Sequence, residues 1–182
     1  MRIVGGKHRG RNLVRVGKDT TRETADMVKE SVFNMLGGSL NGIVLDLFAG
    51  SGAYGLEAIS RGASFLHAVD HDRDAIKTIL ENAKIINESN QVSVSLKDYK
   101  RYLNTLDESL FFDIVFIDPP YDFIVYHEVL EKLNPNLNPG ALVVCESKKQ
   151  IVLDDQISSL HKIKERVYGI KRITIYEKIK DL

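Results

Sequence analysis

The chain has 182 residues, of which 43% are hydrophobic and 27% are charged, and its formal net charge is zero. These proportions are typical of a globular protein and exclude a disordered or fibrous chain. No apolar run approaches the roughly 18 residues of a membrane span, and no signal-peptide core precedes the first cations. We therefore expect a cytoplasmic protein with no membrane contact. Its single cysteine, Cys145, excludes an internal disulfide, and its apolar neighbours predict that it is buried in a strand.

Residues 1–18 carry only basic charges, whereas the rest of the chain is net acidic. This segment holds Arg2, Lys7, Arg9, Arg11, Arg15 and Lys18 and no acidic residue. Within it, residues 2–4 and 12–16 are expected to pair as a short hairpin across a turn at residues 5–10. Its exposed side would be basic and suited to nucleic acid, although such a block can also be a solvated terminus.

A helix is expected after the basic segment. Thr20 or Thr21 can cap its first turn, and Gly37-Gly38 ends it after Leu36. Between these points, a recurrence every three or four residues predicts one buried face. This face consists of Met27, Val28, Ser31, Val32, Met35 and Leu36.

From residue 42 onward, strand and helix patterns alternate, which is the signature of a doubly wound α/β fold with a mainly parallel sheet. Apolar runs predict strands at residues 43–48, 65–70, 91–96, 113–118 and 142–146. Helices are expected at residues 52–60, 76–86, 100–106, 126–133 and 156–160. Two further strands, 161–168 and 170–178, flank Gly169 and form an antiparallel hairpin. The predicted sheet therefore has seven strands.

A glycine-rich turn follows the first predicted strand. Ligands of open parallel sheets bind beyond the carboxyl ends of the strands, and Gly50, Gly52 and Gly55 have the spacing of a dinucleotide-binding loop. Asp70 ends the next strand, where a ribose-binding acid is expected, and Phe48 lies beside the turn. Because NAD and S-adenosylmethionine both contain adenosine, this loop alone leaves the two cofactors open.

Two further acids favour S-adenosylmethionine. Asp46 precedes the glycine turn, where a carboxylate can meet the ammonium or sulfonium charge of this cofactor but would repel a pyrophosphate. Asp98 follows the third strand and can accept a hydrogen bond from the adenine amine. The alternatives are a strand-end carboxylate bonded to nearby backbone for Asp46 and a helix cap for Asp98.

Asp118-Pro119-Pro120-Tyr121 follows the apolar run 114–117 and is the most informative motif of the chain. The prolines fix the backbone and lack N–H groups, so their carbonyls stay available as acceptors. Asp118 and the Pro119 carbonyl can accept the two N–H groups of an exocyclic amine while Tyr121 stacks on the base. The simpler alternative is a proline-rich turn that ends a strand.

With these motifs the chain resembles the amino-group methyltransferases, whose motif after the fourth strand is Asp or Asn, Pro, Pro and an aromatic residue. Over nearly its whole length it is similar to the RsmD family, bacterial enzymes that methylate N2 of guanine 966 in 16S ribosomal RNA. The resemblance lies in residues 2–6, 9–11, 44–52, 118–121 and 168–169. It implies a Rossmann-like class I methyltransferase fold with S-adenosylmethionine as the methyl donor.

We expect residues 1–38 to form an RNA-binding appendage and residues 39–182 to form the methyltransferase domain. The implied partner is 16S ribosomal RNA within the assembled small subunit, and the protein is expected to be a monomer. The histidines lack metal-ligand spacing, so no metal is expected. The expected catalytic residues are Asp118, Pro119, Pro120 and Tyr121, the expected cofactor-binding residues are Asp46, Phe48, Gly50, Gly52, Asp70 and Asp98, and the expected RNA contacts are Arg2, Lys7, Arg9, Arg11, Arg22, Lys171 and Arg172.

The first helix departs from the family pattern. The family usually has Arg-Pro-Thr where this chain has Arg22-Glu23-Thr24, and Met27 replaces a common arginine. The loss of a proline and a cation weakens the expected RNA contacts there and leaves the chemistry unchanged.

Three other functions remain open from the sequence. A DNA methyltransferase acting on adenine N6 or cytosine N4 would use the same motif, but little of this short chain is left for recognising a duplex. An NAD-dependent oxidoreductase would need only the glycine loop. A non-catalytic RNA-binding protein could have the same fold without the reaction.

Overall fold

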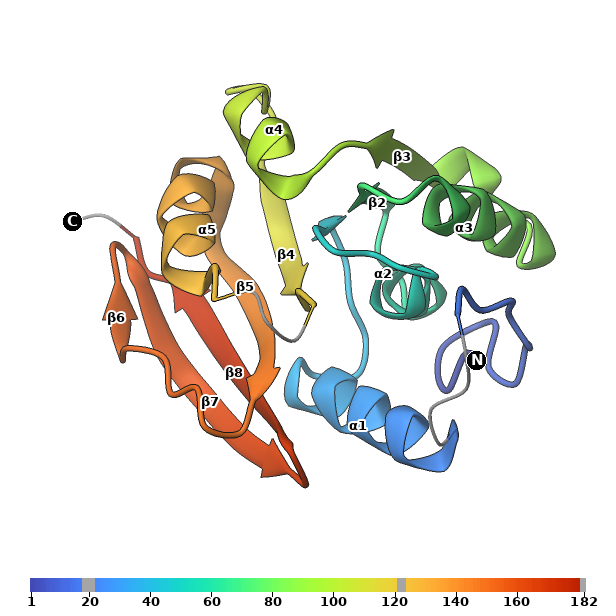
Figure 1. Cartoon of the computed structure of the whole chain (residues 1–182), viewed down its shortest axis with the longest axis horizontal. Coiled ribbons are helices and arrows are strands. Elements are labelled where there is room, and N and C mark those ends of the chain that lie inside the picture. The colour runs from blue at the N-terminus through green and yellow to red at the C-terminus, as the bar shows by residue number, and fades with distance from the viewer. Residues whose placement is uncertain (18–21, 121–123, 181–182) are drawn as a thin grey trace.

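A single sheet runs through the chain. The computed structural model describes residues 1–17, 22–120 and 124–180, without the side chains of residues 22–24. Its eight described strands have the order β3-β2-β1-β4-β5-β8-β7-β6 (Figure 1). The strands are β1 Ile43–Asp46, β2 Phe65–Asp70, β3 Val92–Leu96, β4 Phe112–Ile117, β5 Leu137–Lys148, β6 Gln156–Ile157, β7 Leu160–Tyr168 and β8 Lys171–Lys178. The helices are α1 Arg22–Met35, α2 Ala53–Ser60, α3 Arg73–Ile85, α4 Tyr99–Asn104 and α5 Tyr126–Leu133, with 3₁₀ turns at Ser89–Gln91 and Asn134–Asn136.

Strands β1 to β5 are parallel, and helices cover both of their faces. Buried parallel strands consist of continuous apolar runs because neither face meets water, and β4 is such a strand, with Val115 0% exposed. Helices α1, α2 and α3 pack on one face, and α4 and α5 pack on the other. The strand order reverses between β1 and β4, and this reversal opens a crevice at the carboxyl ends of the strands.

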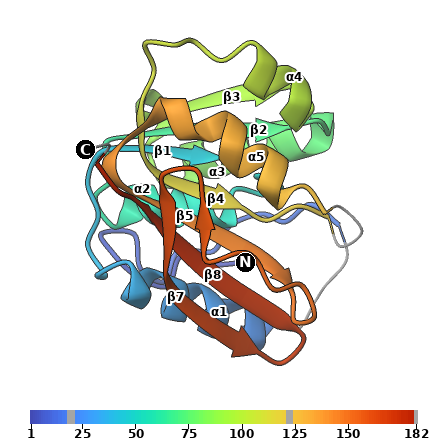
Figure 2. The ribbon, with the colours of Figure 1, turned by 90° about the vertical axis from the view of Figure 1, so that its left-hand side faces the viewer.

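The predicted C-terminal hairpin is present. Strands β7 and β8 lie side by side and extend past α1 (Figure 2), and β8 pairs antiparallel with β5 over residues 142–148. Strand β5 begins at Leu137, well before its predicted start, because Leu137 pairs with Phe112 ahead of a register shift. The sequence Asn138-Pro139-Gly140 is typical of a turn, yet the strand continues through it.

The helix predicted at residues 156–160 is wrong. Gln156 pairs with His161 and Ile157 pairs with Leu160, so these residues form β6 and a tight turn. Ser158 in that turn has φ of 52°, a left-handed conformation that serine rarely adopts. Ile157 and Leu160 are three positions apart, a spacing that fits one face of a helix. The same spacing fits paired positions on either side of a tight hairpin turn, so the sequence alone does not distinguish the two structures.

The predicted N-terminal hairpin is reduced to one antiparallel bridge between Arg2 and Asn12. The Ile3 N–H donates to the Arg11 carbonyl and the Gly10 N–H donates to the Ile3 carbonyl, each at 2.9 Å. Beyond the bridge the chain follows the body of the protein instead of continuing as a strand. Ile3 and Leu13 are buried in the same hydrophobic cluster as residues of α1, α2 and α3.

Helix α1 begins at Arg22, and its predicted caps, Thr20 and Thr21, lie outside the described residues. Val28 and Val32 are buried as predicted, but Met27 is 57% exposed and lies off the buried face. Leu80, in the helix predicted at residues 76–86, is likewise 42% exposed. A helix face about 100° wide does not include every residue at a spacing of three or four.

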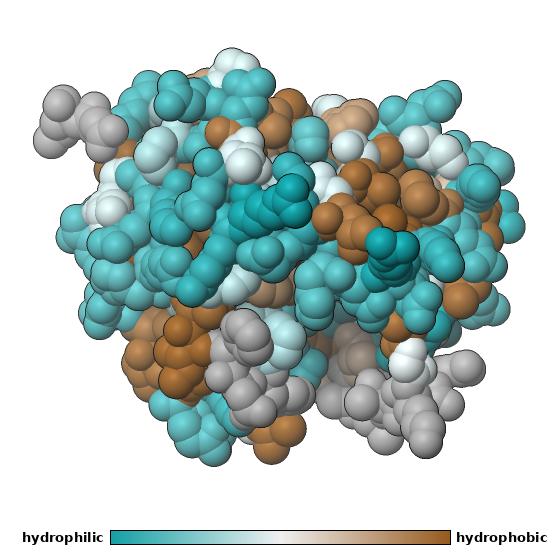
Figure 3. Space-filling view, turned by 45° about the horizontal axis from the view of Figure 1, so that its top comes forward, coloured by the Kyte–Doolittle hydropathy of each residue, from teal (hydrophilic) through white to brown (hydrophobic). Residues whose placement is uncertain are grey.

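Hydrophilic side chains cover most of the surface seen in Figure 3, and hydrophobic side chains gather there in separate patches. Scattered exposed apolar residues are normal for a globular protein. Within the described ranges, no helix combines the length and the apolar composition needed to cross a membrane.

Candidate active site

A cavity of about 740 Å³ lies at the carboxyl ends of the parallel strands. Its wall contains most of the predicted cofactor-binding and catalytic side chains, although they come from different strand ends. The predicted residues that it brings together are Phe48, Gly50, Asp70, Asp98, Asp118, Pro119, Pro120 and Lys171. This volume is within the range of small-molecule sites, roughly 300 to 1,000 Å³.

The glycine turn between β1 and α2 forms one wall of the cavity. Gly50 and Gly52 have positive φ values of 54° and 85°, which favour glycine at both positions. The Gly50 N–H donates to Asp70 Oδ2 at 2.8 Å, and the Asp72 N–H donates to Asp70 Oδ1 at 2.9 Å. A Cβ on Gly52 would lie 2.9 Å from Leu56 Cδ1, so Gly52 permits close packing behind the turn and does not line the cavity.

Asp46 lies beneath this turn and does not line the cavity. It is 2% exposed, and the Gly55 N–H donates to its Oδ2 at 3.0 Å. The pKa of Asp46 is raised to about 7, mainly by burial and to a smaller extent by the charge of Asp70, while the Gly55 hydrogen bond opposes the shift. So high a pKa means that hydrogen-bond donors and cations around Asp46 stabilise its negative charge too little to offset burial. A positively charged ligand nearby would add that stabilisation.

Asp98 and two aromatic rings form the opposite wall. Asp98 is the N-cap of α4 and accepts a hydrogen bond from the Arg101 N–H at 3.0 Å, yet it also lines the cavity. Phe48 and Tyr99 lie with ring centroids 5.4 Å apart, and both line the cavity. Sequence reasoning missed Tyr99, for which an aromatic residue directly after a strand-end acid was the available signal.

Asp118, Pro119 and Pro120 line the cavity directly after β4, and Tyr121 lies outside the described residues. Burial raises the pKa of the Asp118 carboxyl well above its usual range, and the charge of Glu146 adds to this shift. Lys171 acts in the opposite direction. The charges that act on Asp118 are therefore two carboxylates, Glu146 and Asp46, and one ammonium, Lys171.

Glu146, at the end of β5, is a site residue that sequence reasoning missed. It is 6% exposed and lines the cavity, and its carboxylate contacts the Lys171 ammonium at 2.5 Å. The Tyr54 hydroxyl donates to Glu146 Oε2 at 2.7 Å, and the Tyr126 hydroxyl donates to the Glu146 carbonyl at 2.6 Å. The available signal was that Glu146 directly follows the apolar run that contains Cys145. Asp46 and Asp118 occupy similar positions in or after their own apolar runs.

Tyr54 connects the glycine turn with Glu146. Its ring stacks on Phe116 with centroids 5.0 Å apart and planes 12° apart. Burial raises the pKa of Tyr54 well above its usual range, and the charges of Glu146 and Asp118 add to the shift. The hydroxyl therefore remains a donor to Glu146 at any physiological pH.

The predicted RNA-contacting cations lie in three different environments. Lys171 is in the cavity, paired with Glu146, instead of on an open surface. Arg172 contacts Glu165 and donates to the Lys149 carbonyl. In the N-terminal segment, Arg2 pairs with Asp26 and Lys7 contacts Glu88. Arg9 and Arg11 are exposed, and the side chain of Arg22 lies outside the described part of the chain.

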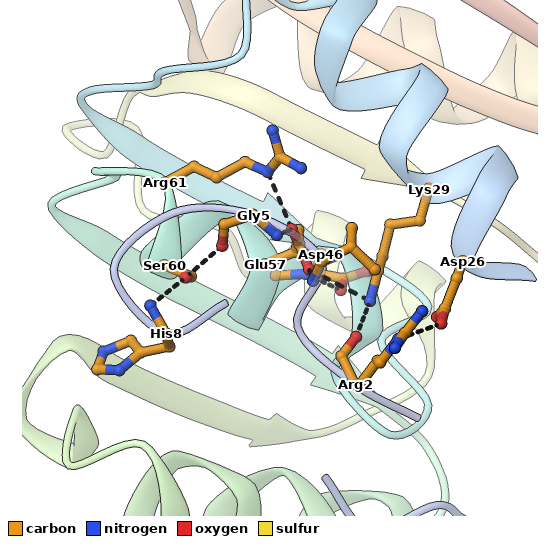
Figure 4. A network of polar contacts seen from close by, with 11 residues as sticks. Arg2, Gly5, His8, Asp26, Lys29, Asp46, Glu57, Ser60 and Arg61 are labelled. Atoms are coloured by element: carbon orange, nitrogen blue, oxygen red, sulfur yellow. Dashed lines mark hydrogen bonds and ion pairs between the residues drawn. The ribbon is translucent and has the colours of Figure 1, made fainter. Parts of the chain in front are cut away.

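A buried carboxylate attaches the N-terminal segment to α2. Glu57 is 0% exposed and accepts hydrogen bonds from the N–H groups of Val4 at 3.0 Å and Gly5 at 2.8 Å. Lys29 at 3.3 Å and Arg61 at 2.9 Å pair with the same carboxylate (Figure 4). The basic segment is therefore packed against the protein body through its backbone, with its long cationic side chains facing outward at Arg9 and Arg11.

The same segment also supports the cavity. Arg15 and Val16 line it, and the Val16 N–H donates to Ser51 Oγ at 2.7 Å. The Asn82 amide accepts from the Val14 N–H at 2.7 Å and donates to the carbonyls of Val14 at 2.9 Å and Ser51 at 3.0 Å. In the part of the chain that is described, no group of three or more His, Cys, Asp or Glu side chains is arranged to hold a metal ion.

Comparison with known proteins identifies the family. The chain matches the family described as "Conserved hypothetical protein 95" over residues 1–177. Ribosomal RNA small subunit methyltransferase D of Haemophilus influenzae is 32% identical over 183 residues, which cover 97% of this chain and 93% of the relative. The chain belongs to the RsmD family.

Solved structures agree with membership of the RsmD family. The structure of yhhF from Escherichia coli is 30% identical, has a TM-score of 0.84 and covers 100% of this chain and 99% of that chain. The structure of SMU.776, complexed with SAH, is 14% identical with a TM-score of 0.71 over 86% of this chain and 50% of that chain, which shows a shared fold. The predicted Rossmann-like methyltransferase fold is confirmed, with β6 as an additional strand.

The protein is an S-adenosylmethionine-dependent methyltransferase. This conclusion excludes the oxidoreductase and the non-catalytic alternatives. The described residues fit the cofactor: two acids, Asp70 and Asp98, and two aromatic residues, Phe48 and Tyr99, line the cavity, and a Cβ on Gly50 would meet no atom within 4 Å. A carboxylate retains acceptor capacity for ribose hydroxyls after accepting two backbone hydrogen bonds.

Proposed function

We propose that the protein methylates the exocyclic N2 amine of guanine 966 in 16S ribosomal RNA. The relatives of the RsmD family named above support ribosomal RNA of the small subunit as the substrate class. The observation that carries the proposal is that Asp118 and the cofactor-side carboxylates Asp70 and Asp98 line the same cavity. An amine held by Asp118 would therefore be within reach of a methyl donor.

The chemistry follows from the amine and the motif. S-adenosylmethionine supplies an electrophilic methyl group on a positively charged sulfur. The Asp118 carboxylate and the Pro119 carbonyl accept hydrogen bonds from the two N–H groups of the amine. These bonds direct the lone pair of the amine nitrogen at the methyl carbon. A nitrogen–carbon bond forms as the sulfur–carbon bond breaks, and sulfur retains the electron pair. The amine then loses one proton to Asp118 or to water.

Charge in the cavity suits this reaction. The raised pKa of Asp118 reflects burial beside Glu146, and a positive ligand favours the ionised carboxylate. As positive charge develops on the amine in the transition state, the ionised carboxylates stabilise it without reorganising. Because a paired base cannot enter such a cavity, the guanine must be unpaired or rotated out of its stack.

The proposed partner is the assembled small ribosomal subunit, and the protein is proposed to act in the cytoplasm as a monomer. Residues 1–38 would contact the RNA, with the exposed Arg9 and Arg11 as the first phosphate contacts and Arg2, Lys7 and Arg22 as further ones. Cofactor contacts are proposed for Phe48, Gly50, Asp70 and Asp98, with Asp46 acting from beneath the turn.

The test is methyl transfer by Asp118→Ala to small subunits from cells that lack the gene. We expect the rate to fall by roughly a hundredfold to a thousandfold, as for the loss of a transition-state contact, with RNA affinity largely kept. Glu108→Ala, which changes an exposed carboxylate, is the matched control and should match the wild type. Unchanged transfer by Asp118→Ala would exclude its proposed role.

Mass spectrometry of the product locates the methyl group. Methylation at guanine 966 supports the proposal. A methyl group on adenine N6 or cytosine N4 would instead favour the alternative amino-methyltransferase.

A further inference from the structure

We propose that Glu146 is a specificity-determining residue that accepts the N1–H of the target guanine beside the amine held by Asp118. This inference rests on the proposed function and adds which side chain distinguishes guanine from other bases that carry an exocyclic amine. Glu146 is outside the sequence motif, and its role follows from its position in the sheet.

The register of the sheet places Asp118 and Glu146 next to each other. Ile117, the last residue of β4, is paired with Cys145 of the parallel strand β5, and Asp118 and Glu146 are the residues that follow them along the chain. Neighbouring strands lie about 4.8 Å apart, and paired positions share a face. Both side chains line the cavity, and the charge of Glu146 acts on Asp118. Two acceptors from neighbouring strand ends therefore face the same cavity.

The carboxylate of Glu146 is held in position by two side chains. Tyr54 donates to Oε2, and the Lys171 ammonium contacts Oε1. Stacking on Phe116 fixes Tyr54 in turn. A carboxylate that receives donors on both oxygens acts there as a hydrogen-bond acceptor. These two contacts leave acceptor capacity on a group that has about four lone-pair sites.

A second acceptor beside the first selects guanine by elementary hydrogen-bond matching. Next to its amine, guanine has N1–H, a donor, whereas adenine has N1 and cytosine has N3, both acceptors. With Asp118 on the amine, Glu146 would hydrogen-bond N1–H of guanine and would oppose a lone pair on adenine or cytosine. A site that hydrogen-bonds a donor discriminates strongly against an analogue that lacks it.

The test separates recognition of N1–H from positioning of the amine. Small subunits are reconstituted with 16S ribosomal RNA that carries either guanine or 2-aminopurine at the target. 2-Aminopurine has the same 2-amine, but its N1 is an acceptor. We expect the wild type to prefer guanine in kcat/KM by at least about a hundredfold. We expect Glu146→Gln to reduce this preference at least about tenfold, because its amide can donate to N1 of 2-aminopurine.

A second variant protects the test against misfolding. Glu146→Gln leaves Lys171 without its carboxylate partner, so the double change Glu146→Gln with Lys171→Met is measured in parallel. Binding of S-adenosylmethionine and thermal unfolding verify that each variant is folded, and Glu108→Gln is the matched control, expected to retain the wild-type preference.

Each outcome decides one hypothesis. Equal loss on both substrates in the variants would show that Glu146 only shapes the site, and a wild type without preference for guanine over 2-aminopurine would overturn the inference alone. A wild type that methylates no guanine of the small subunit would overturn the proposed function and this inference together.

Discussion

Two buried carboxylate groups in this protein have opposite surroundings. Glu57, beneath the N-terminal segment, is 0% exposed and is contacted by two cations and two backbone N–H groups. Asp46, Asp118 and Glu146, at the ends of β1, β4 and β5, are close enough that their charges affect one another, with Lys171 as a neighbouring cation. Glu57 has a donor for each of its roughly four lone pairs. The second group has three carboxylates beside Lys171.

This difference separates a structural site from a reactive one. A carboxylate with every lone pair satisfied fastens two segments together and has little to offer a ligand. Buried carboxylates whose pKa values are raised, as those of Asp46 and Asp118 are, favour a positive ligand such as a sulfonium, together with an amine. The number of donors and cations around a buried carboxylate therefore distinguishes a structural role from a reactive one better than its burial does.

The largest expected effect is on stability, from Glu57→Gln. Removing the charge leaves Lys29 and Arg61 buried near an uncharged amide, and breaking a buried pair in this way costs roughly 3 to 5 kcal/mol. Urea unfolding of the variant measures the loss. Glu108→Gln is the exposed control, and we expect it to change stability by less than about 0.5 kcal/mol. A small effect at Glu57 together with lost methyl transfer would contradict the structural role given to it.

The next prediction concerns Asp46, whose pKa is about 7 in the folded protein against 3.8 as its ordinary value. The folded state binds the proton more tightly, so its contribution to stability falls as the pH rises from about 4 through 7. Asp46→Asn retains an acceptor for the Gly55 N–H and removes the charge. At pH 8 we expect it to stabilise the ligand-free protein by up to roughly 4 kcal/mol, with no gain well below pH 4.

Urea unfolding of wild type and variant across this pH range measures that difference. Asp155→Asn is the control, because its side chain is 96% exposed. A stability difference independent of pH would mean that Asp46 is compensated in the same way as Glu57. Calorimetry would add whether the variant binds S-adenosylmethionine more weakly, as expected if the negative charge attracts the cofactor.

The smallest expected effect is on RNA affinity. Arg9 and Arg11 are exposed and are expected to contact phosphates, so replacing both by glutamine should reduce the slope of log affinity against log salt by about 1 to 2. Stability and cofactor binding should not change, because neither residue lines the cavity. Lys132→Gln on α5 is the control. An unchanged salt dependence would assign RNA binding to another surface.

Most of the fold follows from sequence periodicity, and the exceptions have local causes. Alternating apolar runs and helical patterns predicted the parallel strands and α2 to α5 because each depends on its own residues. The start of β5 depends on pairing between Leu137 and Phe112, and β6 depends on a left-handed serine, Ser158. Neither a distant pairing nor an uncommon backbone conformation has a local sequence signal.

The candidate site divides in the same way. Strand-end acids and glycines predicted Asp70, Asp98 and Asp118 because the carboxyl edge of a parallel sheet gathers them. Lys171 was expected on the surface, since nothing in its local sequence indicates that β8 pairs antiparallel with β5 and brings it to Glu146. Contacts between strands far apart in sequence therefore complete a site that local motifs only begin.

Asn82 has a consequence for how this sequence can vary. Its single amide bonds Val14 on one side and Ser51 on the other, using its oxygen as acceptor and its nitrogen as donor. Aspartate would lack the donor, and leucine would lack both groups. Because these bonds of Asn82 reach only main-chain groups, side chains at positions 14 and 51 can change, whereas position 82 itself is expected to tolerate few substitutions.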